Sequence, residues 1–116
     1  MMLSRSKPSI VLTGVVNEDG MRILEDVGEV VFIEKPEEML SEDELIRYLR
    51  DAEAVLVRRG VARITRRVIE SASRLIIIAR HGVGYDTIDV GAATERGYGL
   101  PQHPSRRSSR LLLSML

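Results

Sequence analysis

The sequence predicts an α/β fold in three layers, with a doubly wound parallel sheet of four to five strands. Two observations predict it. Short apolar segments rich in β-branched residues alternate along the chain with amphipathic segments of helical period. The apolar segments are hydrophobic on both faces, which is typical of strands buried in a parallel sheet. Because the connections are short, right-handed β-α-β units are the expected arrangement.

The first unit begins with a strand over residues 9–15 (SIVLTGV). Asn17 is placed to cap a helix that ends at Gly28, where a C-cap glycine is expected. A second strand follows over residues 29–33. The residues of this helix expected to face inward are Met21, Leu24 and Val27.

The next units repeat this alternation. Ser41 and Glu44 match a capping box at the start of a second helix, which leads to a strand over residues 54–57. Thr65 opens a third helix, followed by a strand over residues 75–79. The expected inward-facing residues of the two helices are Leu45, Ile46, Leu49, Val68, Ile69 and Ala72.

A short helix capped by Asp89 closes the pattern at Gly97, and a sheet with this connectivity is flavodoxin-like. The sequence predicts a domain over residues 1–97 and a Ser/Arg-rich tail over residues 98–116. Pro101 and Pro104 exclude a regular helix early in the tail. A final helix is expected from Ser105 or Ser108, carrying the leucines of residues 111–116.

Composition excludes several classes of function. The net charge is zero, which argues against a general nucleic-acid binder. We expect no membrane span and no secretory leader, and therefore a cytoplasmic protein. There is no cysteine and there are two histidines, so no metal site is expected. Many charged residues and few thermolabile ones are compatible with a thermophilic source.

Candidate binding residues follow two of the predicted strands. Arg58 follows the third strand, and Gly82 and Gly84 lie in a turn after the fourth. Ligands of open α/β sheets bind beyond the carboxyl ends of the strands. Backbone N–H groups of a glycine-rich turn form anion-binding nests, and an arginine fork matches a carboxylate. If the two strands are neighbours, these groups together predict a small organic acid as ligand.

Simpler interpretations remain open for each residue. Gly82 and Gly84 fit an ordinary turn equally well. Arg59 is better explained as a solvated loop charge, and His81 as a structural hydrogen-bonding residue. The segment GVGYDT lacks a third glycine at the spacing of a dinucleotide fingerprint and follows the fourth strand rather than the first.

Several segments resemble one enzyme family. Residues 80–89 (RHGVGYDTID) resemble the R-x-G-x-G-x-D-N-[IV]-D signature of D-isomer-specific 2-hydroxyacid dehydrogenases. Residues 90–97 (VGAATERG) are similar to the helix that follows in that family, and residues 54–65 to its VRS-x-T-x-[VI]-T segment. The resemblance extends over residues 10–97, and D-3-phosphoglycerate dehydrogenases are the most similar members.

The resemblance implies a truncated substrate-binding domain. It assigns the substrate acid to Arg58 and to backbone groups at Val83 and Gly84, with Gly82 and His81 beside them. NAD is implied for the full-length family, in a separate Rossmann domain that has no counterpart here. We therefore expect this chain to bind no cofactor. The family's catalytic Arg, Glu and His have no counterpart either, so no catalytic residue is assigned.

The sequence departs from the family at three places. Thr87 replaces an Asn, Arg59 replaces a Ser, and the family pattern is lost after Gly97. Two functions remain open. The chain is a dehydrogenase substrate domain that is inactive alone, or a stand-alone module for small-carboxylate binding or oligomerisation. A 2-hydroxy or 2-oxo acid is the expected ligand, and exposed apolar surface together with the tail predicts a homodimer.

Overall fold

The computed structural model describes residues 7–14, 16–34, 40–57, 63–81, 88–99 and 110–115, without the side chains of His81, Ser114 and Met115. Its strands are β1 (Ser9–Leu12), β2 (Glu29–Phe32), β3 (Ala54–Val57), β4 (Ile77–His81), β5 (Tyr98–Gly99) and β6 (Arg110–Met115). Its helices are α1 (Glu18–Val27), α2 (Glu42–Leu49), α3 (Arg66–Ser71) and α4 (Val90–Glu95).

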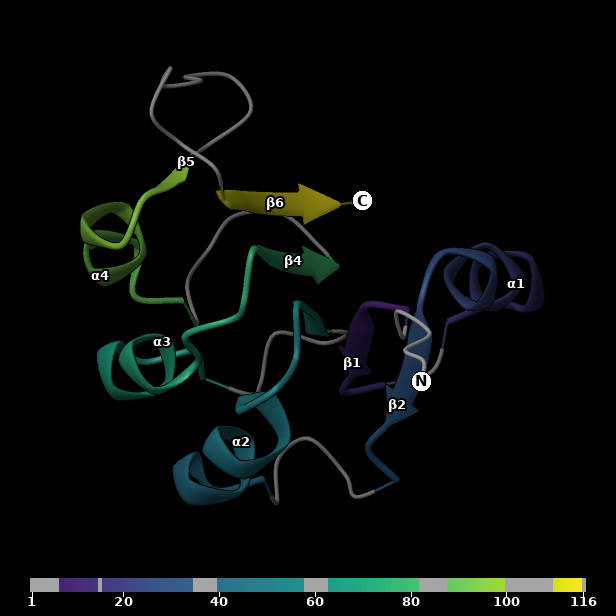
Figure 1. The fold of residues 1–116 in the computed structure, drawn as a ribbon, viewed down its shortest axis with the longest axis horizontal. Helices are drawn as coiled ribbons and strands as arrows, with labels where there is room; N and C mark the ends of the chain where they lie inside the picture. Colours follow the sequence, from purple (N-terminus) through teal and green to yellow (C-terminus); the bar gives the residue numbers. More distant parts are fainter. Residues whose placement is uncertain are drawn as a thin grey trace, which may run out of the picture.

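These strands form one parallel sheet in the order β2-β1-β3-β4-β6-β5. Helix α1 lies on one side of the sheet, and α2, α3 and α4 lie on the other (Figure 1). The predicted three-layer, doubly wound fold is confirmed. The described sheet has six strands, rather than the four to five expected.

Side-chain caps begin the helices where the sequence predicts them. Asn17 accepts a hydrogen bond from the Gly20 N–H at 2.7 Å, and Ser41 forms a capping box with Glu44. Gly97 ends α4 with a positive φ of 89°, a backbone conformation that glycine tolerates best. Gly28 caps α1 in extended backbone instead, and there a Cβ would lie 2.6 Å from the Pro8 carbonyl oxygen.

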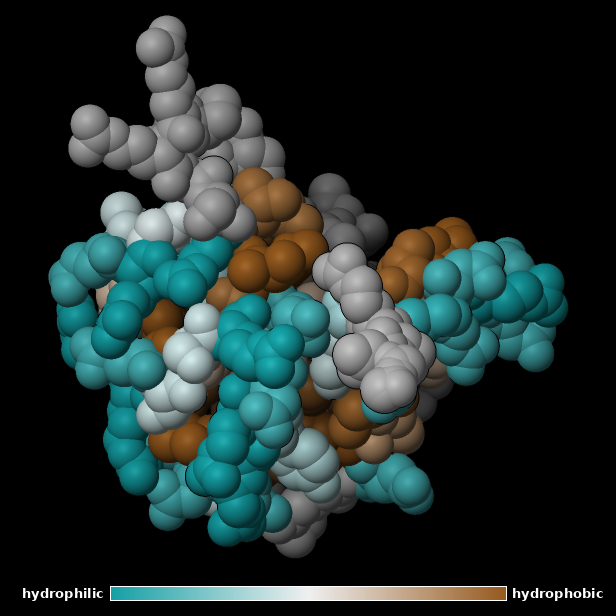
Figure 2. Space-filling model, in the orientation of Figure 1, coloured by the Kyte–Doolittle hydropathy of each residue, from teal (hydrophilic) through white to brown (hydrophobic). Residues whose placement is uncertain are grey.

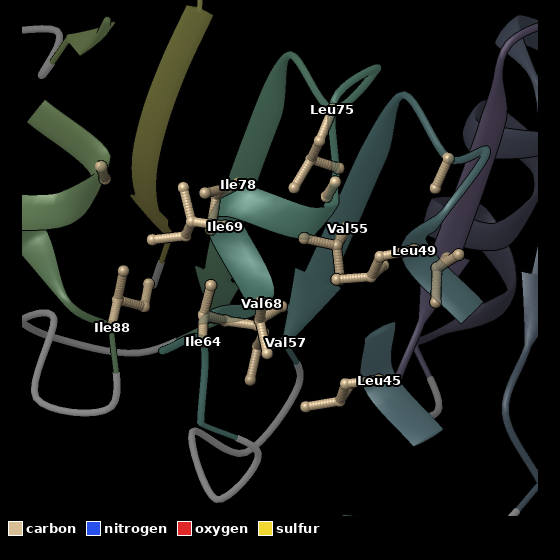
Figure 3. Close-up of a cluster of buried hydrophobic side chains, with 14 of the residues drawn as sticks. Leu45, Leu49, Val55, Val57, Ile64, Val68, Ile69, Leu75, Ile78 and Ile88 are labelled. Atoms are coloured by element: carbon tan, nitrogen blue, oxygen red, sulfur yellow. The ribbon is translucent and has the colours of Figure 1, made fainter. Parts of the chain in front are cut away.

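The main core lies between the sheet and the three helices α2, α3 and α4. Figure 3 shows Val55, Val57 and Ile78 of the strands directed toward side chains of α2 and α3. The large, fully buried side chains of this cluster include Leu45, Leu49, Ile64, Val68, Leu75 and Leu112. A smaller cluster under α1 contains Ile10, Leu12, Leu56 and Ala79.

The expected final helix is wrong. Residues 110–115 form β6, which lies between β4 and β5 and pairs with both. Exposure alternates along this strand, from 42% at Leu111 to 0% at Leu112. The local leucine run suits a helix, but the hydrogen-bonding groups of β4 and the core beside Ile78 select a strand. Other strand boundaries also move: β1 ends at Leu12, β2 ends at Phe32 and β4 covers Ile77–His81, instead of the expected ends at 15 and 33 and the expected range 75–79.

Arg110, the first residue of β6, binds backbone carbonyls that follow α3 and α4. Its guanidinium donates to the Arg96 carbonyl at 2.8 Å and to the Ser73 carbonyl at 3.3 Å. It also lies 5.4 Å from the ring centroid of Tyr98, whose hydroxyl donates to the Leu75 carbonyl at 2.5 Å. The carbonyls that Arg110 binds follow α3 and α4, where a positive charge is favoured.

Candidate functional site

The predicted site lies at the carboxyl edge of the sheet, where β3 and β4 end side by side. Val57, the last residue of β3, is in register with Arg80 of β4. The condition on which the carboxylate site depends, that these strands are neighbours, is therefore met. Arg58 directly follows Val57 in sequence, and Gly82 directly follows His81, the last residue of β4.

Most of the predicted ligand-binding residues lie outside the described part of the chain. These are Arg58, Gly82, Val83 and Gly84. His81 is described as backbone only, in register with Met115 of β6. Their roles in binding stay predictions. The described residues on either side of positions 58–62 and 82–87 are called the frame of the site below.

The chain pairs again at Ile64 and Ile88, which lie after these positions. Ile64 and Ile88 form an isolated parallel bridge, and the Asp89 N–H donates to the Ile64 carbonyl at 2.9 Å. Both isoleucine side chains are buried. The described residues that flank positions 58–62 and 82–87 are thus paired on both sides, Val57 with Arg80 and Ile64 with Ile88.

Each segment leads into a capped helix. Thr65 accepts a hydrogen bond from the Val68 N–H at 3.3 Å, and Asp89 accepts one from the Ala92 N–H at 2.9 Å. Asp89 is therefore a cap residue, as its position in the sequence predicts. Asp86, the other acid of this region, lies outside the described residues.

Charged side chains join the helices behind the site. The Thr65 hydroxyl donates to Glu42 at 2.5 Å, and Arg67 contacts Glu42 and Asp43 at 2.8 Å each. The hydrogen bonds from Thr65 and Arg67 lower the pKa of the Glu42 carboxyl, and those to Glu42 and Asp43 raise the pKa of Arg67. Exposed pairs of this kind stabilise a fold only weakly, so their main effect is to orient α2 against α3.

A second pair joins α3 to α4. Arg66 binds both carboxylate oxygens of Glu95, at 2.9 and 3.0 Å. These bonds lower the pKa of Glu95 and raise that of Arg66. This bidentate contact therefore joins the two helices that follow Ile64 and Ile88.

Sequence reasoning missed two residues of the frame. Thr13 is 3% exposed, and its N–H and hydroxyl both donate to the Leu56 carbonyl, at 3.1 and 3.4 Å. It thereby fixes β3 two residues before Arg58. Arg80 is a half-buried arginine that follows three apolar residues of β4, on the same face as Ile78 by alternation. A polar residue after a buried strand, and a charge within one, were the available signals.

The described residues include no group of three metal-ligating side chains, and none of their helices has the length and apolar character needed to cross a membrane.

Comparison with known proteins identifies the family. Residues 10–105 match the D-isomer specific 2-hydroxyacid dehydrogenase, catalytic domain. The chain belongs to this family. The match extends beyond the predicted limit at Gly97, to residue 105.

Two curated relatives show how the family likeness is distributed. The chain is 42% identical over 99 residues to D-3-phosphoglycerate dehydrogenase of Methanocaldococcus jannaschii, covering 85% of this chain and 18% of that protein. It is 38% identical over 98 residues to glyoxylate reductase of Pyrococcus furiosus, covering 84% and 29%. The chain thus spans less than a third of either relative.

Solved structures agree with the fold. A 3-phosphoglycerate dehydrogenase of Entamoeba histolytica, solved with bound NAD+, superposes with a TM-score of 0.68 at 26% identity, over 94% of this chain and 33% of that one. The 2-hydroxyacid dehydrogenase of Ketogulonicigenium vulgare gives a TM-score of 0.60 at 27% identity, over 80% and 28%.

Proposed function

We propose that this family member binds the carboxylate of a small 2-hydroxy or 2-oxo acid, as the substrate-binding part of a D-2-hydroxyacid dehydrogenase. Arg58 supplies the charged fork, and backbone N–H groups of residues 82–84 supply further donors, with His81 beside them. The pairing of the flanking residues supports the proposal: Val57 is in register with Arg80, and Ile64 forms a bridge with Ile88.

The proposal assigns acid binding, and not hydride transfer, to this segment by itself. A dinucleotide fingerprint follows the first strand of its domain, whereas Gly82 and Gly84 follow β4, the fourth. We therefore propose no NAD site at Gly82 and Gly84. In the proposal, this polypeptide alone binds the acid and does not oxidise NADH with 2-oxo acids. Turnover by the purified chain would contradict this.

Calorimetry with D-glycerate and with glyoxylate tests the binding site. We expect Arg58→Ala to weaken binding by about 1.5–3 kcal/mol, roughly tenfold or more, because a charge-assisted pair to the carboxylate is lost. Arg59→Ala is the matched control, one residue away and with the same charge change, and should leave the affinity within about twofold. Equal affinities of wild type and Arg58→Ala would exclude Arg58 from the site.

A second candidate function is that of an oligomerisation module. Exposed apolar residues on α1 favour it, with Ile23 64% and Val27 58% exposed. A cytoplasmic location and a thermophilic source also stay proposals. Cell fractionation and a thermal melt test them.

A further inference from the structure

The candidate site adjoins the place where the winding of the sheet reverses. The chain leaves β1 through α1 on one side of the sheet, and it leaves β3 through α3 on the other (Figure 1). β1 and β3 are paired neighbours. In doubly wound sheets, ligands bind beyond the carboxyl ends of two such strands. Because β3 also pairs with β4, Arg58, the residue that follows β3, belongs in sequence to both pairs of strand ends.

A buried polar residue lies at the same reversal. Thr13 directly follows β1 and is 3% exposed, and it is the only polar or charged residue that is buried in the described part of the chain. Figure 2 shows hydrophilic residues on the outer sides of α2, α3 and α4 and hydrophobic ones behind them, so Thr13 is an exception to this separation. A hydroxyl in the interior costs free energy unless it is hydrogen-bonded, whereas a valine of similar size carries no such cost. Packing alone therefore does not account for the hydroxyl.

The Thr13 hydroxyl adds a second bond to a carbonyl that already has a donor. The backbone N–H of Thr13 donates to the Leu56 carbonyl at 3.1 Å, and the hydroxyl donates to the same oxygen at 3.4 Å. The Leu56 carbonyl keeps the N–H bond when the hydroxyl is removed, so the second bond constrains its orientation. This carbonyl belongs to the peptide group that joins Leu56 to Val57, and Arg58 is the next residue. A binding side chain must be held within about 0.5 Å of its productive position, which a tilt of this peptide group would exceed.

We propose that Thr13 is a positioning residue of the acid-binding site, and that its hydroxyl directs Arg58 toward the carboxylate by fixing the end of β3. The inference rests on the proposed function, because it needs an acid that Arg58 binds. It extends the site from the ends of β3 and β4 to the end of β1.

Two substitutions of Thr13 separate positioning from a structural role. Calorimetry with D-glycerate and with glyoxylate measures affinity, and urea unfolding measures stability. Thr13→Val should bind about three- to tenfold more weakly, because one neutral hydrogen bond is lost, yet be at least as stable as wild type. Thr13→Ser keeps the hydroxyl and should bind within about twofold of wild type, yet be less stable, because a buried methyl group is lost. Thr94→Val is the matched control, since it makes the same chemical change at an exposed position of α4 and should leave the affinity unchanged.

The outcomes distinguish this inference from the proposed function. In a chain that carries Arg58→Ala, Thr13→Val should weaken binding no further, because Thr13 acts through Arg58. Equal affinities of wild type and Thr13→Val, with Arg58→Ala still weakened, would overturn the role of Thr13 alone. The same holds if affinity follows stability, so that Thr13→Ser binds more weakly than Thr13→Val. A wild-type chain that binds neither acid would overturn the proposed function, and the role of Thr13 with it.

Discussion

Truncating Leu112 tests whether β6 is part of the core. The side chain is fully buried and its residue pairs with Ile78 of β4. Leu112→Ala removes buried methyl groups from a packed interior and should cost about 2–5 kcal/mol. Leu111 is the adjacent leucine of the same strand, but 42% of it is exposed. Leu111→Ala should therefore cost about 1 kcal/mol or less.

Urea unfolding followed by far-ultraviolet circular dichroism measures the difference. The two variants and wild type are compared at one dilute concentration, at which sedimentation shows a single species. At roughly 4 °C per kcal/mol for a domain of this size, Leu112→Ala should also melt about 10 °C or more below wild type. Equal and small losses from both variants would refute the buried strand, because a solvated tail has no such alternation.

Three further predictions concern the charged and polar contacts. Arg110→Ala should lower the free energy of unfolding by about 1–2 kcal/mol, because two hydrogen bonds and the contact with Tyr98 are lost. Arg110→Lys should lower it by less, because the positive charge is kept. Urea unfolding measures both variants. Burial raises the pKa of Tyr98, so the free energy of unfolding should fall as the pH rises above about 10. Tyr98→Phe should abolish this pH dependence. At neutral pH the variant should lose about 1 kcal/mol, because the hydrogen bond to the Leu75 carbonyl is absent. The hydrogen bonds from Arg66 lower the pKa of Glu95 below 4.5, so their contribution to stability is present above that pH and is lost as the pH falls through the lowered pKa. Acid unfolding of Glu95→Gln should therefore depend less steeply on pH than that of wild type. An unchanged pH dependence would contradict a stabilising Arg66–Glu95 pair.

Local signals predict most of the fold. Asn17, Ser41, Thr65 and Asp89 cap their helices as expected, because a side-chain oxygen before a helical segment satisfies N–H groups that have no partner within the helix. The residues after Gly97 are different. Residues 110–115 form a strand because they pair with β4. A pairing partner that is distant in sequence produces no local pattern in the sequence of the strand itself.

The site divides in the same way. Strand periodicity predicts that Arg58 follows the third strand and Gly82 the fourth, but it leaves open whether these strands are neighbours. The register of β3 with β4 shows that they are. Nothing in the sequence predicts the Ile64–Ile88 bridge, because both residues look like isolated apolar positions between a loop and a helix. Contacts between two loops depend on the path of each through space, which local spacing does not specify.

The position of β6 affects the order in which the molecule assembles. β5 precedes β6 in the chain, yet β6 lies between β5 and β4. β5 therefore has no described strand to pair with until the residues that follow it have joined the sheet. During synthesis, the strands β1 to β4 can pair as soon as they emerge, whereas Tyr98 and Gly99 must wait for residues 110–115. The edge strand β5 therefore joins the sheet last, although it is synthesised before β6, the strand with which it pairs.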